Sequence, residues 1–202
     1  MFYAPNLTYL NFLNLLNVKY IICPQLPSDV SKYDAMTQTA IRELQKYLGQ
    51  NGIEAVFNGR KYVIYKNNNA LPRAFLVPNY EIIKDKNQII ERLKDNNFNP
   101  SKYVLLSESL SEVVHNDSII GSVKIINYTP NKITLETEQD NTAFLVLSEN
   151  YHPEWFCKVD GKLTKIYQAY HTLRAVYLEK GKHKIEFFYY SKFYQIGLII
   201  TL

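Results

Sequence analysis

Aromatic and polar side chains of the kind that bind sugars gather between residues 151 and 174. The apolar C–H faces of a sugar ring stack on aromatic rings, and its hydroxyl groups need hydrogen-bond donors and acceptors beside them. This segment supplies both kinds of group, so it is the predicted ligand-binding site. The candidate residues are Tyr151, His152, Trp155, Tyr170, His171 and Arg174.

A structural role for the same residues competes with binding. Trp155 and Cys157 alternate along one predicted strand, which favours a Trp155 that fills the core of a β-sandwich. Arg174 lies inside an apolar strand, where an unpaired charge is costly. An ion pair with Asp160 or Glu149 is therefore favoured over a ligand contact for this side chain.

No group of residues has the spacing of a known catalytic or metal site. None of the four histidines stands at metal spacing from a second ligand, and no GxSxG motif is present. Glu149, Glu154 and Asp160 lie near one predicted strand end, where a solvated rim is favoured over a catalytic pair of carboxylates. Cys23 and Cys157 fit no metal motif, and a disulfide between them stays open. We expect no catalytic residue, no metal and no cofactor.

The candidate site belongs to a run of short strands separated by turn residues, which predicts an antiparallel β-sandwich over residues 119–190. One predicted strand, residues 142–148, is apolar on both faces and should be central or covered. Asp160-Gly161 is expected to be a hairpin turn. The seven predicted strands are residues 122–128, 132–138, 142–148, 155–159, 164–168, 173–178 and 182–189.

Residues 1–118 are predicted to form a mixed α/β subdomain, which makes the fold class α+β. Strands are expected at residues 18–23 and 103–106, an extended piece at 70–78, and helices at 36–48 and 87–95. Asn58-Gly59 predicts a hairpin with a type I′ turn between residues 53–57 and 60–65. Residues 191–202 form either the start of a membrane helix cut off at the end of the sequence or a closing strand.

Charge and hydropathy exclude two classes of protein. The net charge of +4 comes from 23 basic and 19 acidic residues spread along the chain, which argues against nucleic acid as a partner. No run of 18 or more apolar residues exists, so no segment spans a bilayer by itself.

Three phrases occur in order along the chain: NFLNLLNVKYII (residues 11–22), NNALPRAFLV (68–77) and FLVLSENYHPEWFCKVDGKLTKIYQAYHTLRAVYLEKGKHKIEFFY (144–189). Together they resemble the YfhO-like family of bacterial multispanning membrane proteins, and the last phrase resembles that family's carboxy-terminal extracytoplasmic module. Where the family pattern has Tyr-Tyr-Pro-Gly-Trp, this chain has Glu154 in place of the glycine.

The resemblance implies a place at the extracytoplasmic face of a cell membrane. The family resembles glycosyltransferases that use lipid-phosphate sugars, and its catalytic acids lie in loops that no segment of this chain matches. It therefore implies a non-catalytic domain that positions a glycan acceptor or packs over the membrane active site. Its partners would be the transmembrane part of the same polypeptide and a cell-envelope glycan or lipid-linked sugar. A carbohydrate-binding sandwich module and a structural or protein-interaction domain are the alternatives.

Overall fold

The computed structural model describes residues 9–50, 52–95, 97–110 and 118–191, together with positions 194, 197 and 200. The chain forms two compact units. The first contains residues 1–72 and 93–98, and the second contains residues 73–92 and 99–202. Over the described residues the fold is mostly β with a few helices, which is consistent with the α+β class.

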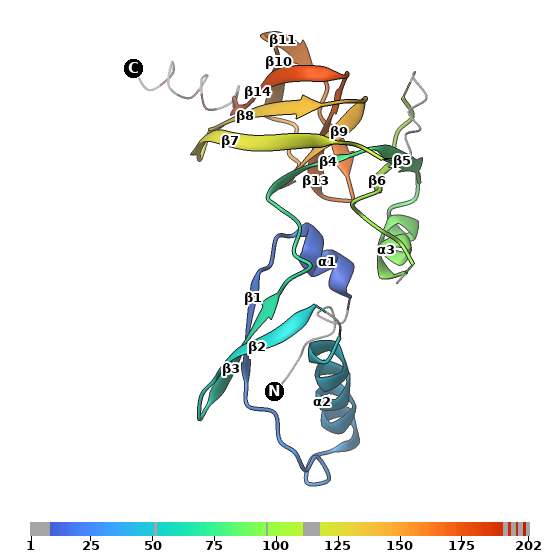
Figure 1. The fold of residues 1–202 in the computed structure, drawn as a ribbon, viewed down its shortest axis with the longest axis vertical. Coiled ribbons are helices and arrows are strands. Elements are labelled where there is room, and N and C mark those ends of the chain that lie inside the picture. The colour runs from blue at the N-terminus through green and yellow to red at the C-terminus, as the bar shows by residue number, and fades with distance from the viewer. Residues whose placement is uncertain are drawn as a thin grey trace. The chain divides into compact units, whose positions relative to one another are not determined.

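The first unit is a small antiparallel sheet with helices (Figure 1). The three strands lie in the order β1-β3-β2, so β3, the last of these three in the sequence, is the central strand. The end of helix α3 (Lys86–Lys94) and the residues after it also belong to this unit. Asn11 Nδ2 donates to the backbone carbonyls of Leu93, Asp95 and Phe98 at 3.1–3.3 Å. The elements are α1 (Leu10–Leu15), β1 (Tyr20–Pro24), α2 (Ala35–Leu48), β2 (Ile53–Asn58) and β3 (Tyr62–Asn67).

Helix α2 packs on one face of this sheet. The Asp34 carboxylate caps the helix by accepting a hydrogen bond from the backbone N–H of Thr37 at 3.0 Å. Side chains from both helices and from β1 make the core beneath α2, namely Leu13, Cys23, Tyr47 and Leu48. The predicted helix at residues 36–48 is thus confirmed, whereas α1 was not predicted.

The hairpin between β2 and β3 forms as expected, but its turn differs from the prediction. Neither Asn58 nor Gly59 has a positive φ, which a type I′ turn requires at both central residues. The turn instead closes from Gly59 N–H to the carbonyl of Tyr62 at 2.9 Å, which puts Arg60 and Lys61 at its centre, two residues further along. A bulge in β2 between Ala55 and Phe57 shifts the pairing register by one residue.

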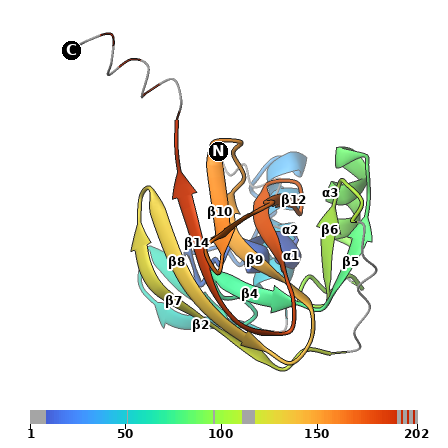
Figure 2. The same cartoon turned by 90° about the horizontal axis from the view of Figure 1, so that it is seen from above.

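The second unit is built from two sheets that pack face to face (Figure 2). One sheet has the strand order β11-β10-β14-β8-β7 and the other has the order β4-β9-β13-β12-β6-β5. The strands are β4 (Ala74–Val77), β5 (Asn79–Ile82), β6 (Tyr103–Leu106), β7 (Gly121–Thr129), β8 (Lys132–Gln139), β9 (Ala143–Asn150), β10 (Trp155–Val159), β11 (Lys162–Thr164), β12 (Tyr167–Ala169), β13 (Leu173–Leu178) and β14 (Gly181–Tyr189). Helix α3 (Lys86–Lys94) lies in sequence between the parallel strands β5 and β6.

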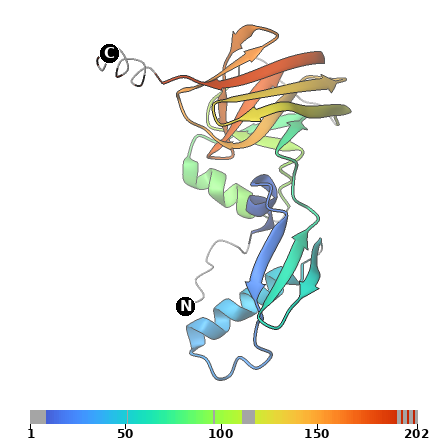
Figure 3. The same cartoon turned by 90° about the vertical axis from the view of Figure 1, so that its left-hand side faces the viewer.

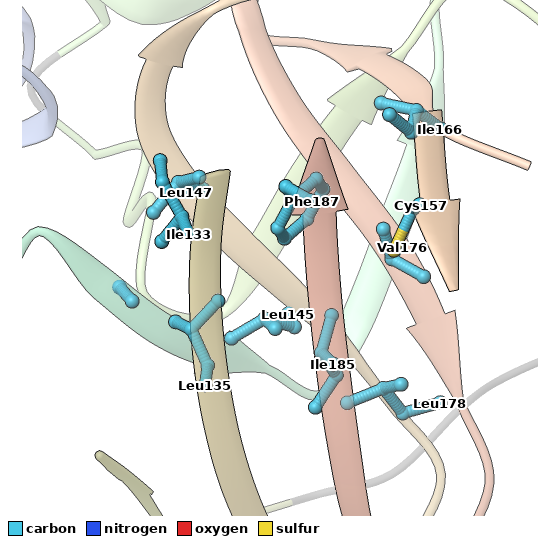
Figure 4. Close-up of a cluster of buried hydrophobic side chains, with 11 residues drawn as sticks. Ile133, Leu135, Leu145, Leu147, Cys157, Ile166, Val176, Leu178, Ile185 and Phe187 are labelled. Carbon is cyan, nitrogen blue, oxygen red and sulfur yellow. The ribbon is translucent and has the colours of Figure 1, made fainter. Parts of the chain in front are cut away.

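Apolar side chains from both sheets meet in a dry core (Figure 4). Ile185 and Phe187 of β14 are fully buried there, as are Leu145 and Leu147 of β9. The second face of β9 is covered as well, because the Phe144 ring contacts those of Tyr80, Tyr167 and Tyr177 at 5.8–5.9 Å. The prediction of a central strand with two buried faces is confirmed.

Two features of the second unit differ from the prediction, and a third is not decided. The described residues 118–191 form eight strands and not seven, because the predicted strand at 164–168 is split into β11 and β12. Strands β4, β5 and β6 also join the sheet of β9 and β13, so the division between units falls at residue 72 and not at 118. Most of residues 191–202 lie outside the described part, so neither expectation for them is decided.

The two cysteines are both buried free thiols. Burial raises the pKa of the Cys157 thiol to about 12 and also raises that of Cys23. The open alternative of a disulfide between them is therefore not realised.

Candidate ligand-binding site at one end of the sandwich

Charged and aromatic side chains from six strand ends gather at one end of the second unit. We call them the Arg174 cluster. They come from the residue before β4, the last residues of β7, β9 and β14, the first residues of β10 and β13, and the loop before β10. The members are Arg73, Tyr128, Glu149, Glu154, Trp155, Arg174 and Tyr189.

Arg174 is the buried centre of this cluster, with only 3% of its surface exposed. Its guanidinium carbon lies 4.0 Å from the centroid of the Trp155 ring, and its Nε donates to the carbonyl of Asn150 at 3.0 Å. Nη2 lies 4.0 Å from a Glu149 carboxylate oxygen. Burial lowers the pKa of Arg174, and the charge of Glu149 opposes that shift. Nη1 is buried and has no hydrogen-bond partner among the residues that the structure describes.

Glu149 joins Arg174 to a more exposed pair of side chains. Its carboxylate accepts hydrogen bonds from the Tyr128 hydroxyl and from Arg73 Nη1. The Arg73 guanidinium also lies over the Tyr128 ring, 5.3 Å from its centroid. The bond to Glu149 raises the pKa of the Tyr128 hydroxyl, which stays protonated and keeps donating. Of the two acids predicted as partners for Arg174, Glu149 is the one that the structure brings to it.

Trp155 connects the buried arginine to a second carboxylate. Its half-buried ring packs on the sandwich core and meets the Tyr189 ring edge-on at 5.7 Å. The Tyr189 hydroxyl donates to Glu154 at 2.5 Å, and Ser191 donates to the other carboxylate oxygen at 2.9 Å. These hydrogen bonds, the one from Tyr189 first, lower the pKa of Glu154. The predicted inward face of Trp155 and Cys157 is confirmed, and contact with Arg174 comes in addition to it.

His152 and Tyr151 lie beside the cluster. The exposed His152 ring lies 6.1 Å from that of Tyr189, and its Nδ1 accepts from the backbone N–H of Glu154 at 3.2 Å. Glu154 does not have a positive φ, so the position where the family pattern has glycine needs none here. Tyr151 is half-buried against the core, and its N–H donates to the carbonyl of Thr172 at 2.6 Å.

Tyr170 and His171 form a turn and do not join the cluster. Their φ values of 47° and 74° place both in the left-handed region, which is strained for bulky residues. The Tyr170 hydroxyl donates to the carbonyls of Pro100 at 2.6 Å and Tyr103 at 2.9 Å, and the residue is 2% exposed. Burial raises the pKa of Tyr170 well above its ordinary value. These contacts give Tyr170 a structural role, because they hold the turn onto the segment before β6.

A hollow of about 410 Å³ lies elsewhere in the unit, on the outer face of the five-stranded sheet. None of the six predicted ligand-binding residues lines it. Lys182 and Glu138, which do, form an ion pair at 3.3 Å across neighbouring strands. This arrangement is the solvated charged face expected of an exposed sheet.

Sequence analysis missed three members of the cluster: Arg73, Tyr128 and Tyr189. Arg73 is 76 positions from Glu149, and no local pattern links them. The alternation of residues along β14 could have placed Tyr189 on the face of Phe187, and hence near Trp155, which pairs with it directly. Tyr128 carries no such signal.

Two further properties bear on function. Among the described residues, no three His, Cys, Asp or Glu side chains are grouped so that they could hold a metal ion. Within that same part of the chain, no helix is both long enough and apolar enough to cross a membrane.

Comparison with known proteins places the second unit in a family. The family described as bacterial membrane protein YfhO matches residues 81–201. The uncharacterized protein YfhO of Bacillus subtilis (strain 168) is 29% identical over 77 residues, which are 38% of this chain and 9% of that protein. The chain thus spans a small part of that relative's length, and no solved structure matches it. Since the family match covers more than half of the chain, the protein belongs to the YfhO family of bacterial membrane proteins.

Proposed function

We propose that this chain is a non-catalytic, extracytoplasmic part of a YfhO membrane protein, and that its Arg174 cluster binds sugar units. The ligand would be a cell-envelope glycan or a lipid-linked sugar, held for the transmembrane part of the same polypeptide. Family membership supports the association with a membrane. Sugar binding rests on the site itself.

The observation that carries the proposal is the buried Arg174 with an unpartnered Nη1. A buried donor without an acceptor costs about 1–3 kcal/mol, so a ligand oxygen that supplies the acceptor gains affinity. The guanidinium lies against Trp155, and two carboxylates, Glu149 and Glu154, flank the pair. Aromatic faces, a cation and acceptors in one place match the C–H faces and hydroxyl groups of a sugar.

The partial exposure of the aromatic residues also supports this function over a purely structural one. Tyr128 and Tyr189 are exposed, and Trp155 is half-buried and not sealed in the core. A tryptophan that only fills a sandwich core needs no charged neighbour at 4.0 Å.

The fluorescence of Trp155, the single tryptophan of the chain, tests sugar binding directly. Short oligomers of N-acetylglucosamine and of glucose, and a lipid-phosphate-linked sugar in detergent, would be titrated into the folded protein. We expect a saturable change in emission with at least one probe. Glu149→Gln should weaken that binding roughly tenfold, because it removes the charge that orients Arg174.

The matched control is Glu138→Gln, which makes the same chemical change on the outer face of the five-stranded sheet. It should leave affinity unchanged. Calorimetry would detect a ligand that binds without altering the emission of Trp155. Absence of binding to every probe by both methods, or equal affinities for Glu149→Gln and the unaltered protein, would contradict the proposal.

A further inference from the structure

The first unit has an apolar sheet face that no described element covers. Ile22 of β1 pairs with Ile64 of β3, and Ile64 also pairs with Phe57 of β2, so these three side chains share one face of the sheet. Tyr20 lies two residues from Ile22 on the same face. Tyr62 lies two residues from Ile64 on the same face. Exposed fractions are 60% for Tyr20, 69% for Ile22, 57% for Phe57 and 53% for Tyr62. We call this set, with Ile64, the outer sheet face.

The opposite face of the same sheet shows what this exposure means. There Cys23 and the half-buried Tyr65 and Ile53 pack with side chains of α1 and α2, and Val63 is buried as well. In Figure 3, α2 lies to one side of the three strands. Contiguous apolar patches of this kind mark interaction surfaces, whereas scattered single residues do not. The outer sheet face therefore needs an occupant.

The chemistry around the face points to lipid. Four basic residues lie in or next to the three strands, against the single acidic residue Glu54. All four are exposed: Lys19, Arg60, Lys61 and Lys66. Tyrosine and phenylalanine rings beside lysine and arginine are the side chains that favour the bilayer interface, where rings sit at headgroup level and cations meet anionic lipid.

From this we infer that the outer sheet face docks on an anionic lipid bilayer, with its rings and Ile22 in the interfacial layer and its basic residues against the headgroups. A protein partner fits less well, because the four cations form no ion pair within the described part of the chain, and they match a uniformly anionic surface without needing matched carboxylates. The family match, over residues 81–201, places the chain among bacterial membrane proteins. The inference does not depend on sugar binding by the second unit.

Flotation of the folded chain with vesicles tests the inference. Vesicles of phosphatidylcholine and phosphatidylglycerol in equal parts should carry the protein upward, and vesicles of phosphatidylcholine alone should carry much less. Added salt should weaken the binding, because it screens the lysines and arginines. Ile22→Ser should lower the partition coefficient roughly tenfold, and Arg60→Gln with Lys61→Gln should lower it on anionic vesicles only.

Leu163→Ser is the matched control, because Leu163 is an equally exposed strand residue at 71% but lies in β11 of the second unit. It should partition like the unaltered chain. Circular dichroism and unfolding curves would establish that each variant is folded. No flotation with anionic vesicles, or equal losses for Ile22→Ser and Leu163→Ser, would overturn the inference. Concentration-dependent dimers without vesicle binding would also overturn it and indicate a protein partner.

Discussion

The two units use the apolar residues of their sheets in opposite ways. In the first unit, helices cover one face of a three-stranded sheet and the other face stays exposed, with Ile22 and Phe57 among its residues. In the second unit, two sheets cover each other, and Ile185 and Phe187 of β14 are fully buried between them. The strand residues are of the same types, so burial depends on whether a second layer is present.

The exposed sheet face of the first unit is a surface available for binding, whereas the facing sheets of the second unit form a core. Apolar surface removed from water stabilises a fold by about 25 cal/mol per Å², and surface left in water adds nothing. The inner faces of the sandwich should therefore dominate its stability, and the outer sheet face of the first unit should contribute little to folding. The predictions below test that contrast, starting with the largest effect.

Phe187→Ala should lower the free energy of unfolding of the second unit by about 3–5 kcal/mol, because it leaves a cavity between the sheets. Phe57→Ala, on the outer sheet face, should change stability by no more than about 0.5 kcal/mol. Trp155 fluorescence during denaturation reports on the second unit, and the reactivity of the buried Cys23 thiol reports on the first. Equal destabilisation by the two substitutions would remove the contrast.

Tyr170→Phe should destabilise the second unit by about 1–3 kcal/mol, since it takes the hydroxyl from two backbone carbonyls in a buried site. Tyr62→Phe removes an exposed hydroxyl from the first unit and should be nearly neutral. Denaturant unfolding measures both. If Tyr170→Phe is stable but loses sugar affinity, the structural role assigned to Tyr170 is wrong.

Asp34→Ala should loosen α2, because it removes the cap that accepts from Thr37. Opening of this helix uncovers the inner face of the three-stranded sheet, where Cys23 is buried. A thiol reagent should then label Cys23 several-fold faster, with the labelling of Cys157 unchanged. The neighbouring Asp29→Ala, outside the helix, serves as control. Faster labelling of both cysteines would show that the units do not open separately.

The smallest effect concerns pH. A hydrogen bond from His183 at 2.7 Å, and then one from the backbone N–H of Lys184, lower the pKa of the Asp160 carboxyl. A carboxyl with a lowered folded pKa contributes stability above its unfolded pKa of about 3.9, and that stability is lost as the pH falls through the folded pKa. Because Asp160 is half exposed, the contribution should not exceed about 1 kcal/mol.

Asp160→Asn should thus be less stable than the unaltered chain at neutral pH and equal to it in strong acid. Asparagine tolerates the φ of 51° found at this position, so the turn itself should survive. Unfolding free energies measured across the acid range check the difference. A gap between the two proteins that stays constant with pH would assign the effect to the turn and not to the carboxylate.

The strands of the second unit were largely predictable because their signals are local. Short strand-like runs separated by turn residues placed β7, β8, β9, β10, β13 and β14 within two residues of their ends, and Asp160-Gly161 forms the expected hairpin turn, with φ values of 51° and 80°. Asn58-Gly59 was predicted for the same reason, yet β2 contains a bulge and the turn forms two residues further along, at Arg60 and Lys61. A bulge depends on the partner strand, so the local sequence does not reveal it.

The candidate site was predicted only in part. Trp155 and Arg174 were both among the predicted site residues, and Trp155 both contacts Arg174 at 4.0 Å and packs on the core. Tyr170 was assigned to the site because of its neighbours in sequence, but the turn directs its hydroxyl to Pro100 and Tyr103. Nearness in sequence does not determine where a side chain lies once the backbone reverses direction.

The sequence by itself determined the positions of most strands, the Asp160-Gly161 turn and the helical face of α2, because propensity and periodicity act between residues a few positions apart. Only the tertiary structure decided that β4 pairs with β9, that Arg73 reaches Glu149, and that one apolar sheet face is covered while another is exposed. These outcomes depend on hydrogen bonds and apolar contacts between segments far apart in the chain, and neither kind of interaction leaves a signal in the sequence of one segment alone.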